Sequence, residues 1–283
     1  RERREEKGER PSGESGGKRK SRSGYIEMEA YEWVSDLSKG GQGSTMIARE
    51  VESGEEFVIK TVACDSMQAC NLALMEAKVL QNLEHPNVVV YIDVFLHQDP
   101  ANNGLQVCTV MDYCAGGDLA HRLHDVRLTN EALPETQTRT WLAQIAQGLA
   151  YMHENEMIHR DVKPQNIFIT RDGALKIGDF GLATKQSDRR QSARVGTPAY
   201  LAPEVLNKEV SGPPVDVWGL GCIALEMATL RSLVERKTML GVELLSSPLA
   251  PGQLPPALSP ALRQCIAGML RCSANAHRER AEG

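Results

Sequence analysis

The chain has 283 residues, of which 41% are hydrophobic and 24% charged, so it can bury a substantial core and is not disordered throughout. Aromatic residues make up only 5% of the chain, which predicts a mostly aliphatic core. The formal net charge of −5 argues against a general nucleic-acid-binding protein.

Residues 1–24 differ in composition from the rest of the chain. They contain nine Lys or Arg, five Asp or Glu and almost no large apolar residues, so burial cannot offset the entropy lost on ordering them. We therefore predict a disordered basic tail over residues 1–24. Its basic cluster at 18–20 has two interpretations, a localisation signal or a solvated stretch, and the second is favoured.

A region of short strands is predicted to begin near residue 31. Apolar and β-branched runs occur at 45–49, 57–62, 88–95 and 105–111. One helical stretch, about 67–81, interrupts these runs, and its apolar positions are spaced for a single face. The residues of that face are Leu72, Met75, Val79 and Leu80. The pattern predicts a small antiparallel sheet with one helix.

After residue 118 the pattern becomes helical. Residues 136–154 carry an apolar stripe with i, i+4, i+8 spacing, and residues 215–230 are apolar nearly all round, as in a buried helix. A loop rich in Pro and Gly is predicted at 246–260, followed by a last helix at 260–271. We therefore expect an α+β protein with a β-rich lobe, a short connection and a helical lobe.

The chain has no apolar run of the roughly 18–20 residues that a membrane-spanning helix requires, and its first residues show no secretory signal. The seven cysteines are odd in number and form no Cys-x-x-Cys pair. We interpret them as reduced thiols rather than as a metal site. These features predict an intracellular protein, located in the cytoplasm, with the nucleus as the alternative.

Gly40, Gly41 and Gly43 form a glycine-rich segment between two predicted strands. Such a turn lets backbone N–H groups approach phosphate oxygens, although glycine-rich turns also occur without a ligand. Lys60 ends an apolar strand 17 residues after Gly43, where it either points into solvent or reaches the same phosphates. Glu76, in the middle of the predicted helix, either lies on the surface or pairs with Lys60.

The segment 158–166 concentrates a histidine, three further charged residues and an asparagine directly after a helix. Pro164 disfavours continuation of the helix, which predicts a loop held between structured elements, where catalytic residues often lie. Asp179 follows the next predicted strand pair. The oxygen atoms of Asp161, Asn166 and Asp179 suit a proton acceptor or a hard cation such as Mg²⁺.

These segments occur in the order found in eukaryotic protein kinases, and residues 31–283 resemble that family. The matching elements are the glycine-rich loop, the strand lysine, the helix glutamate, His159-Arg160-Asp161, Asp179-Phe180-Gly181, Ala202-Pro203-Glu204 and Asp216-Val217-Trp218-Gly219. The resemblance implies a bilobal kinase fold with an N-terminal lobe at 31–111, a hinge at 112–118 and a C-terminal lobe at 119–283. Since a complete kinase lobe has one more helix, we expect the C-terminal lobe to be truncated.

The resemblance also implies ATP as the phosphoryl donor, Mg²⁺ as the cofactor and a role for each matching residue. The ATP-binding residues would be Gly40, Gly41, Gly43, Lys60, Glu76 as the partner of Lys60, Met111 as the gatekeeper, and the hinge residues Asp112 and Cys114. Asp161 would accept or orient the proton of the substrate hydroxyl. Lys163 and Lys60 would be the other catalytic residues. Asn166 and Asp179 would hold the metal ions.

The substrate class follows from Lys163, which stands two residues after Asp161 and in the serine/threonine kinases approaches the γ-phosphate. The phrase 196–200 is also of the serine/threonine type, and Thr197 is expected to bridge Asp161 and Lys163. We therefore expect protein substrates with Ser or Thr acceptors. The phrases 85–93, 110–119 and 195–198 are most similar to the NIMA-related (NEK) group. Ser192 and Thr197 are candidate regulatory sites, although Ser192 could equally be an ordinary loop residue.

Two functions are open at this point, an active serine/threonine kinase and a pseudokinase or scaffold that binds nucleotide or partners without efficient transfer. Three residues depart from the family pattern around ATP, namely Ser38 for the first loop glycine, Thr45 for the usual valine and Val58 for the usual alanine. The strand lysine, the catalytic aspartate and the metal aspartate, which pseudokinases typically lose, are all present. Their presence favours the active enzyme.

Overall fold

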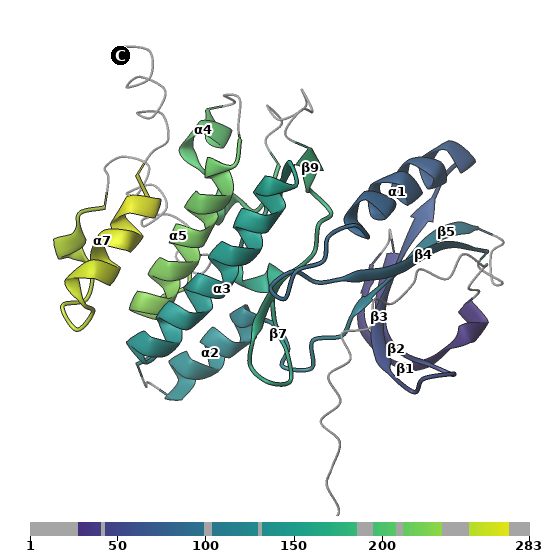
Figure 1. Ribbon diagram of the computed structural model, residues 1–283, viewed down its shortest axis with the longest axis horizontal. Helices are drawn as coiled ribbons and strands as arrows, with labels where there is room; N and C mark the ends of the chain where they lie inside the picture. The colour runs from purple at the N-terminus through teal and green to yellow at the C-terminus, as the bar shows by residue number, and fades with distance from the viewer. Residues whose placement is uncertain are drawn as a thin grey trace, which may run out of the picture.

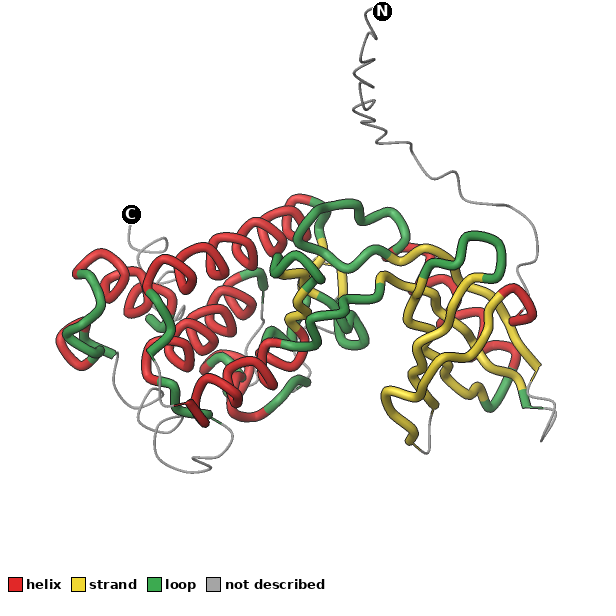
Figure 2. The backbone as a smooth tube through the Cα atoms, turned by 90° about the horizontal axis from the view of Figure 1, so that it is seen from below, coloured by secondary structure: helices red, strands yellow, loops and turns green. Residues whose placement is uncertain are grey.

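The computed structural model describes residues 28–40, 43–98, 104–129, 132–185, 195–207, 212–233 and 249–271. They form two lobes, a small sheet with one helix and a larger helical body, which lie next to each other along the long axis of the molecule (Figures 1 and 2). The predicted bilobal α+β fold is confirmed. The predicted tail at 1–24, Gly41 and Ser192 lie outside the described residues.

The smaller lobe contains a five-stranded antiparallel sheet with the strand order β1-β2-β3-β5-β4. Its strands are β1 (Tyr31–Gly40), β2 (Gly43–Glu50), β3 (Glu56–Cys64), β4 (Tyr91–Gln98) and β5 (Leu105–Asp112), and a short 3-10 turn (Met28–Ala30) precedes them. Strand β3 is central, and its Lys60 lies opposite Thr45 of β2 and Thr109 of β5. The lysine is therefore carried by a strand that is paired on both sides.

The strand predicted at 88–95 begins later, at Tyr91. Val88 instead forms an isolated bridge with Ile177 of the helical lobe, and the backbone N–H of Val89 donates to the Ile177 carbonyl at 2.8 Å. These apolar residues are strand-like in composition, but they connect the two lobes rather than extend the sheet.

Helix α1 (Met67–Leu80) begins after Ser66, whose hydroxyl accepts a hydrogen bond from the Ala69 N–H at 3.2 Å. The helix is where it was predicted, but only part of its predicted apolar face is buried: Leu80 is buried and Val79 packs against the core. Leu72 and Met75 are 55% and 67% exposed. The face that packs on the sheet contains Cys70, Ala73, Leu74, Ala77 and Leu80. Cys70, Ala73 and Ala77 on this face are small, which suits close packing of the helix against β4 and β5.

The larger lobe is mainly helical, as predicted. Its helices are α2 (Leu119–Thr129), α3 (Glu135–Glu154), the short α4 (Pro203–Leu206), α5 (Pro214–Thr229) and α7 (Pro260–Met269), with 3-10 turns at Pro164–Asn166, Pro198–Tyr200 and Pro251–Gln253. Two short antiparallel pairs lie at the boundary between the lobes, β6 (Met157–Ile158) with β9 (Thr184–Lys185) and β7 (Ile167–Ile169) with β8 (Leu175–Ile177). Helix α2 is not among the predicted elements. None of the helices in the described ranges is long and apolar enough to cross a membrane.

Helix α5 is buried along most of its length, as its apolar sequence predicts. It nevertheless carries two carboxylates, Asp216 near its first turn and Glu226 near its last, which are 1% and 2% exposed. Because a buried charge is costly unless it is paired and hydrogen-bonded, each carboxylate must have partners in the surrounding structure. Asp216 contacts the loop that follows β6, and Glu226 contacts Arg127 of helix α2 and Tyr200.

Candidate active site

The loop after β6 is held in place by hydrogen bonds to Asp216 of helix α5. The Asp216 carboxylate accepts hydrogen bonds from the backbone N–H groups of His159 at 2.9 Å and Arg160 at 2.8 Å, and it also contacts His153 Nε2 at 2.8 Å. Arg160 has a φ of 66°, a left-handed conformation that is unfavourable for a side chain of its size. The buried carboxylate therefore holds a strained backbone turn directly before Asp161.

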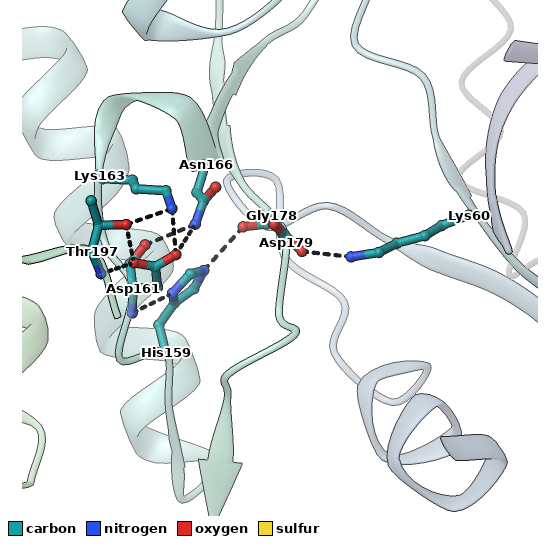
Figure 3. A network of polar contacts seen from close by, with 8 residues as sticks. All are labelled: Lys60, His159, Asp161, Lys163, Asn166, Gly178, Asp179 and Thr197. Carbon is teal, nitrogen blue, oxygen red and sulfur yellow. Dashed lines mark hydrogen bonds and ion pairs between the residues drawn. The ribbon is translucent and has the colours of Figure 1, made fainter. Parts of the chain in front are cut away.

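Asp161 lies at the centre of a dense network of hydrogen bonds (Figure 3). Its Oδ1 accepts from both the N–H and the hydroxyl of Thr197, each at 2.9 Å. Its Oδ2 accepts from Lys163 Nζ at 2.6 Å and from Asn166 Nδ2 at 3.1 Å. Lys163 also donates to the Thr197 hydroxyl at 2.7 Å, so Thr197 bridges the two residues as expected.

These contacts set the protonation state of Asp161. Burial by itself would raise the pKa of its carboxyl group, but the hydrogen bonds and charge of Lys163 and the hydrogen bonds of Thr197 outweigh burial and lower the pKa below its ordinary value. Asp161 is therefore an ionised hydrogen-bond acceptor at neutral pH. A phosphate on Thr197 would place like charge against this carboxylate, so the regulatory role predicted for Thr197 would act by breaking the network.

Asn166 and Asp179 lie between Asp161 and Lys60 of the smaller lobe (Figure 3). Asn166 Nδ2 also donates to the Asp161 carbonyl at 2.9 Å, which orients the amide and leaves its oxygen available on the other side. The Asn166 carbonyl accepts from the Gly178 N–H at 2.9 Å, directly before Asp179. Phe180 is buried and contacts the rings of Tyr91 and His159, which fixes the backbone on the far side of Asp179.

Lys60 extends from strand β3 toward Asp179, and its Nζ lies 2.8 Å from Asp179 Oδ1 (Figure 3). The expected ion pair between Lys60 and Glu76 is not formed. Glu76 is exposed on helix α1, because the face of the helix that packs on the sheet contains Cys70 and Ala77 instead. The structure thus brings Lys60 to Asp179, and the role of Glu76 stays a prediction.

The glycine-rich segment lies at the tip of the β1–β2 hairpin, where Gly40 is paired with Gly43. A Cβ atom on Gly43 would lie 2.0 Å from the Thr61 carbonyl oxygen, so the close approach of β2 to β3 requires glycine here. Gly41 lies outside the described ranges.

The predicted gatekeeper and hinge residues lie at the end of β5. Met111 is half-buried and lies opposite Val58 on β3. The backbone N–H of Asp112 donates to the Val90 carbonyl at 3.1 Å, and its carboxylate forms an ion pair with Lys176 Nζ at 2.5 Å. Cys114 is buried, and burial raises the pKa of its thiol to about 11. The side chains of Asp112 and Cys114 are thus engaged within the protein, so adenine would be contacted through the backbone.

The donor set fits Mg²⁺ bound together with phosphates. In the described part of the chain, no cluster of three or more His, Cys, Asp or Glu side chains would hold a metal by itself. Mg²⁺ is usually held by one or two carboxylates plus substrate phosphates and water, rather than by an all-protein cage. The Asp179 carboxylate, 44% exposed, and the Asn166 amide oxygen are hard donors of that kind.

Some of the residues that shape the site have no role assigned from the sequence. Asp216 belongs to a quoted motif, but its role in holding the loop at 158–166 becomes clear only from its contacts. Tyr200, Glu226 and Arg127 form a second buried network next to Thr197. The one signal that sequence reasoning could have used is the charge of Asp216 and Glu226 within an otherwise apolar helix.

A two-lobed protein with a lysine, two aspartates and an asparagine in the cleft has the architecture of a phosphotransferase. The family model for the protein kinase domain matches residues 31–273, and the chain therefore belongs to the protein kinase family.

The curated relatives agree with the predicted similarity to the NIMA-related group. The serine/threonine-protein kinase Nek1 of Mus musculus is 35% identical over 75% of this chain and 17% of its own length, and Nek4 of the same species is 35% identical over 80% and 28%. The serine/threonine-protein kinase Nek3 of Oryza sativa subsp. japonica is 34% identical over 87% of this chain and 41% of its own length. The chain thus spans less than half the length of these relatives.

Proposed function

We propose that the protein transfers the γ-phosphoryl group of Mg-ATP to Ser or Thr hydroxyl groups of protein substrates. The observation that carries this proposal is the Asp161 carboxylate, held ionised by Lys163 and Thr197 and hydrogen-bonded by Asn166, close to the Lys60–Asp179 ion pair. The names of the relatives, all serine/threonine-protein kinases, support the same reaction class.

In the proposed reaction, a bond forms between the acceptor oxygen and the γ-phosphorus while the bond from that phosphorus to the β–γ bridging oxygen breaks. ADP leaves, and the proton of the hydroxyl passes to Asp161. Because the transition state for phosphoryl transfer is loose, the protein contributes mainly position and charge. Bound Mg²⁺, held by Asn166 and Asp179, would neutralise charge on the phosphates.

The other residues of the cleft have supporting roles in this proposal. Lys60 is drawn toward the α- and β-phosphates from its strand, and Lys163 supplies positive charge near the γ-phosphate. Gly40, Gly41 and Gly43 cover the phosphates with backbone N–H groups, since no side chains stand in the way. The adenine site is lined by Met111, Asp112 and Cys114. Glu76 would pair with Lys60 once helix α1 has turned.

A transfer assay with Mg-ATP labelled at the γ-position and a generic protein substrate tests the proposal. We expect the unsubstituted protein to phosphorylate Ser or Thr, and the Asp161→Asn variant to lose at least about 10³-fold in kcat. Mg-ATP should still raise the melting temperature of the variant, because Asp161 does not hold the nucleotide. Equal incorporation by both proteins contradicts the enzyme. A thermal shift without turnover in the parent favours the binding-only alternative.

The proposal extends to the organisation of the chain. We propose a kinase domain over residues 31–283 with the smaller lobe at 31–111, the hinge at 112–118 and the larger lobe at 119–283, preceded by a basic tail at 1–24. The six cysteines in the described ranges are free thiols, which fits a reducing, intracellular compartment. Of the two candidate regulatory sites, Ser192 can be tested by phosphopeptide mapping of the purified protein.

A further inference from the structure

A second network of buried polar groups surrounds Glu226, at the opposite end of helix α5 from Asp216. Glu226 Oε1 accepts hydrogen bonds from the Tyr200 hydroxyl at 2.5 Å and from the Leu233 N–H at 3.0 Å. Its Oε2 lies 2.9 Å from Arg127 Nη2. The carboxylate is 2% exposed, so its charge is balanced by the protein rather than by water.

Arg127 comes from helix α2 and makes two different contacts. Besides the ion pair with Glu226, its Nε donates to the Leu230 carbonyl at 3.0 Å. Leu230 ends helix α5 in the left-handed conformation, with a φ of 52°, which is unfavourable for a leucine. The planar guanidinium therefore binds a buried carboxylate and a strained helix end at once, which an ammonium group could not do in the same geometry.

Tyr200 links this network to the catalytic loop. Its N–H donates to the Thr197 carbonyl at 2.9 Å, within the 3-10 turn Pro198–Tyr200. Thr197 in turn makes both hydrogen bonds to Asp161 Oδ1, and these three residues line one small cavity. Burial and the neighbouring Glu226 raise the pKa of Tyr200, so its hydroxyl remains a donor.

We propose that Arg127 is a positioning residue for the acceptor side of the active site, acting through Glu226 and Tyr200 on the turn that holds Thr197 against Asp161. This inference rests on the proposed phosphoryl transfer. Helix α5 would then position the site from both ends, with Asp216 holding the catalytic loop and Glu226 holding the segment that faces it. Helix α2, which is far in sequence from the segment that contains Thr197 and Tyr200, would contribute the positive charge.

The physical reason is the cost of leaving Glu226 without a counter-charge. A buried carboxylate that loses its cation either takes up a proton or draws in water. A protonated Glu226 has fewer acceptor positions, and water would compete for Tyr200, so the Thr197 turn would no longer have one fixed position. The nucleotide side of the cleft, built from Lys60 and the hairpin of the other lobe, would not change.

The test is a steady-state comparison of Arg127→Gln with a matched control, Arg139→Gln. Arg139 also lies on a helix of the larger lobe and pairs with a carboxylate, Glu135 at 2.7 Å, but it does not contact Glu226 or Tyr200. We expect kcat/KM for the protein acceptor to fall about tenfold in Arg127→Gln, as for loss of one charge-assisted hydrogen bond, while KM for ATP stays within about twofold. Arg139→Gln should leave both values unchanged.

Further variants separate positioning from general destabilisation. Measured well below the melting temperature of each variant, Arg127→Lys should recover part of the loss, and Tyr200→Phe should reproduce it. The double variant Arg127→Gln/Tyr200→Phe should be no worse than its more affected parent, because both act through one path.

Three outcomes would overturn the inference. They are unchanged kcat/KM in a folded Arg127→Gln variant, equal rises in KM for ATP and for the acceptor, and additive losses in the double variant. If the unsubstituted protein transferred no phosphate while still binding Mg-ATP, the proposed function would fail together with this inference. An active parent with an unaffected Arg127→Gln variant overturns the inference alone.

Discussion

Lys163 forms the shortest of the hydrogen bonds to the Asp161 carboxylate, with Nζ 2.6 Å from Oδ2. With Thr197 and Asn166 included, the Asp161 carboxylate accepts four hydrogen bonds from side chains and backbone. A carboxylate offers about four acceptor positions, so a substrate hydroxyl can bind only when one donor leaves. Lys163 is the donor that the γ-phosphate would attract.

We therefore predict that nucleotide binds before the acceptor. A non-hydrolysable ATP analogue with Mg²⁺ should tighten binding of the acceptor protein about tenfold, since it draws Lys163 away and opens Oδ2, whereas ADP should not. Fluorescence anisotropy with a labelled acceptor measures the difference. In Lys163→Met the acceptor should bind equally with and without the analogue. Equal effects of ADP and the analogue in the parent would contradict the order.

Gly196, directly before Thr197, is a second sensitive position. Its φ is 111°, and a Cβ there would lie 2.8 Å from the Arg160 carbonyl oxygen. Gly196→Ala should therefore shift Thr197 and lower kcat at least about tenfold, for a strain on the order of 1–3 kcal/mol. Gly173→Ala is the matched control, because Gly173 also has a positive φ of 86° but has open space around it. Gly173→Ala should lose stability and keep its kcat. Equal losses of kcat in the two variants would contradict the expectation that Gly196→Ala acts by shifting Thr197.

Glu76 provides a test of how far the family pattern applies to this chain. Since Glu76 is exposed and Lys60 pairs with Asp179, Glu76→Gln should leave the melting temperature of the nucleotide-free protein unchanged. If helix α1 turns to bring Glu76 to Lys60 during the reaction, the same variant should lower kcat/KM for ATP about tenfold. Lys60→Met is the positive reference for that assay. An unchanged kcat/KM in Glu76→Gln would refute the predicted pairing.

The pH dependence of stability should contain a component from Glu135. Hydrogen bonds from Ser259, first its backbone N–H at 2.8 Å, and from Arg139 lower the pKa of Glu135 to about 2, from an ordinary value of 4.5. The unfolded chain therefore takes up a proton before the folded protein does. The stabilisation is complete above pH 4.5 and is lost as the pH falls toward about 2.

Urea unfolding at several pH values measures this component. Between about pH 5 and pH 3, the midpoint for Glu135→Gln should fall less steeply than that of the parent. Glu154→Gln removes a carboxylate from the other end of the same helix, which contacts neither Ser259 nor Arg139, and serves as the control. If the midpoints of the parent and of Glu135→Gln fall equally steeply with pH, Ser259 does not lower the pKa of Glu135.

Much of this molecule could be predicted from local patterns. The positions of helices α3, α5 and α7 follow from apolar periodicity, and the loop at 158–166 follows from its charges and from Pro164. These features depend on residues that are close in the chain. The side of helix α1 that packs on the sheet depends instead on how closely β4 and β5 approach, which periodicity alone does not report.

The Arg127–Glu226 pair could not be predicted for a similar reason. Arg127 is 99 residues before Glu226, and an arginine near the end of a polar helix is ordinarily solvated. Only the fold shows that the guanidinium covers the end of helix α5. The Glu204 carboxylate is a related case, because its Oε2 is buried without a hydrogen-bond partner among the described residues.

Because Gly43 approaches the Thr61 carbonyl so closely, the tip of the β1–β2 hairpin and strand β3, which carries Lys60, must move together. Ser44, the next residue of β2, forms a hydrogen bond between its hydroxyl and that of the same Thr61 at 2.8 Å, and Thr45 lies opposite Lys60. The hairpin tip, which in the proposed function would cover the phosphates, therefore cannot move without moving the backbone that carries Lys60. Nucleotide entry and the release of Lys60 from Asp179 would then be one coupled displacement rather than two independent ones.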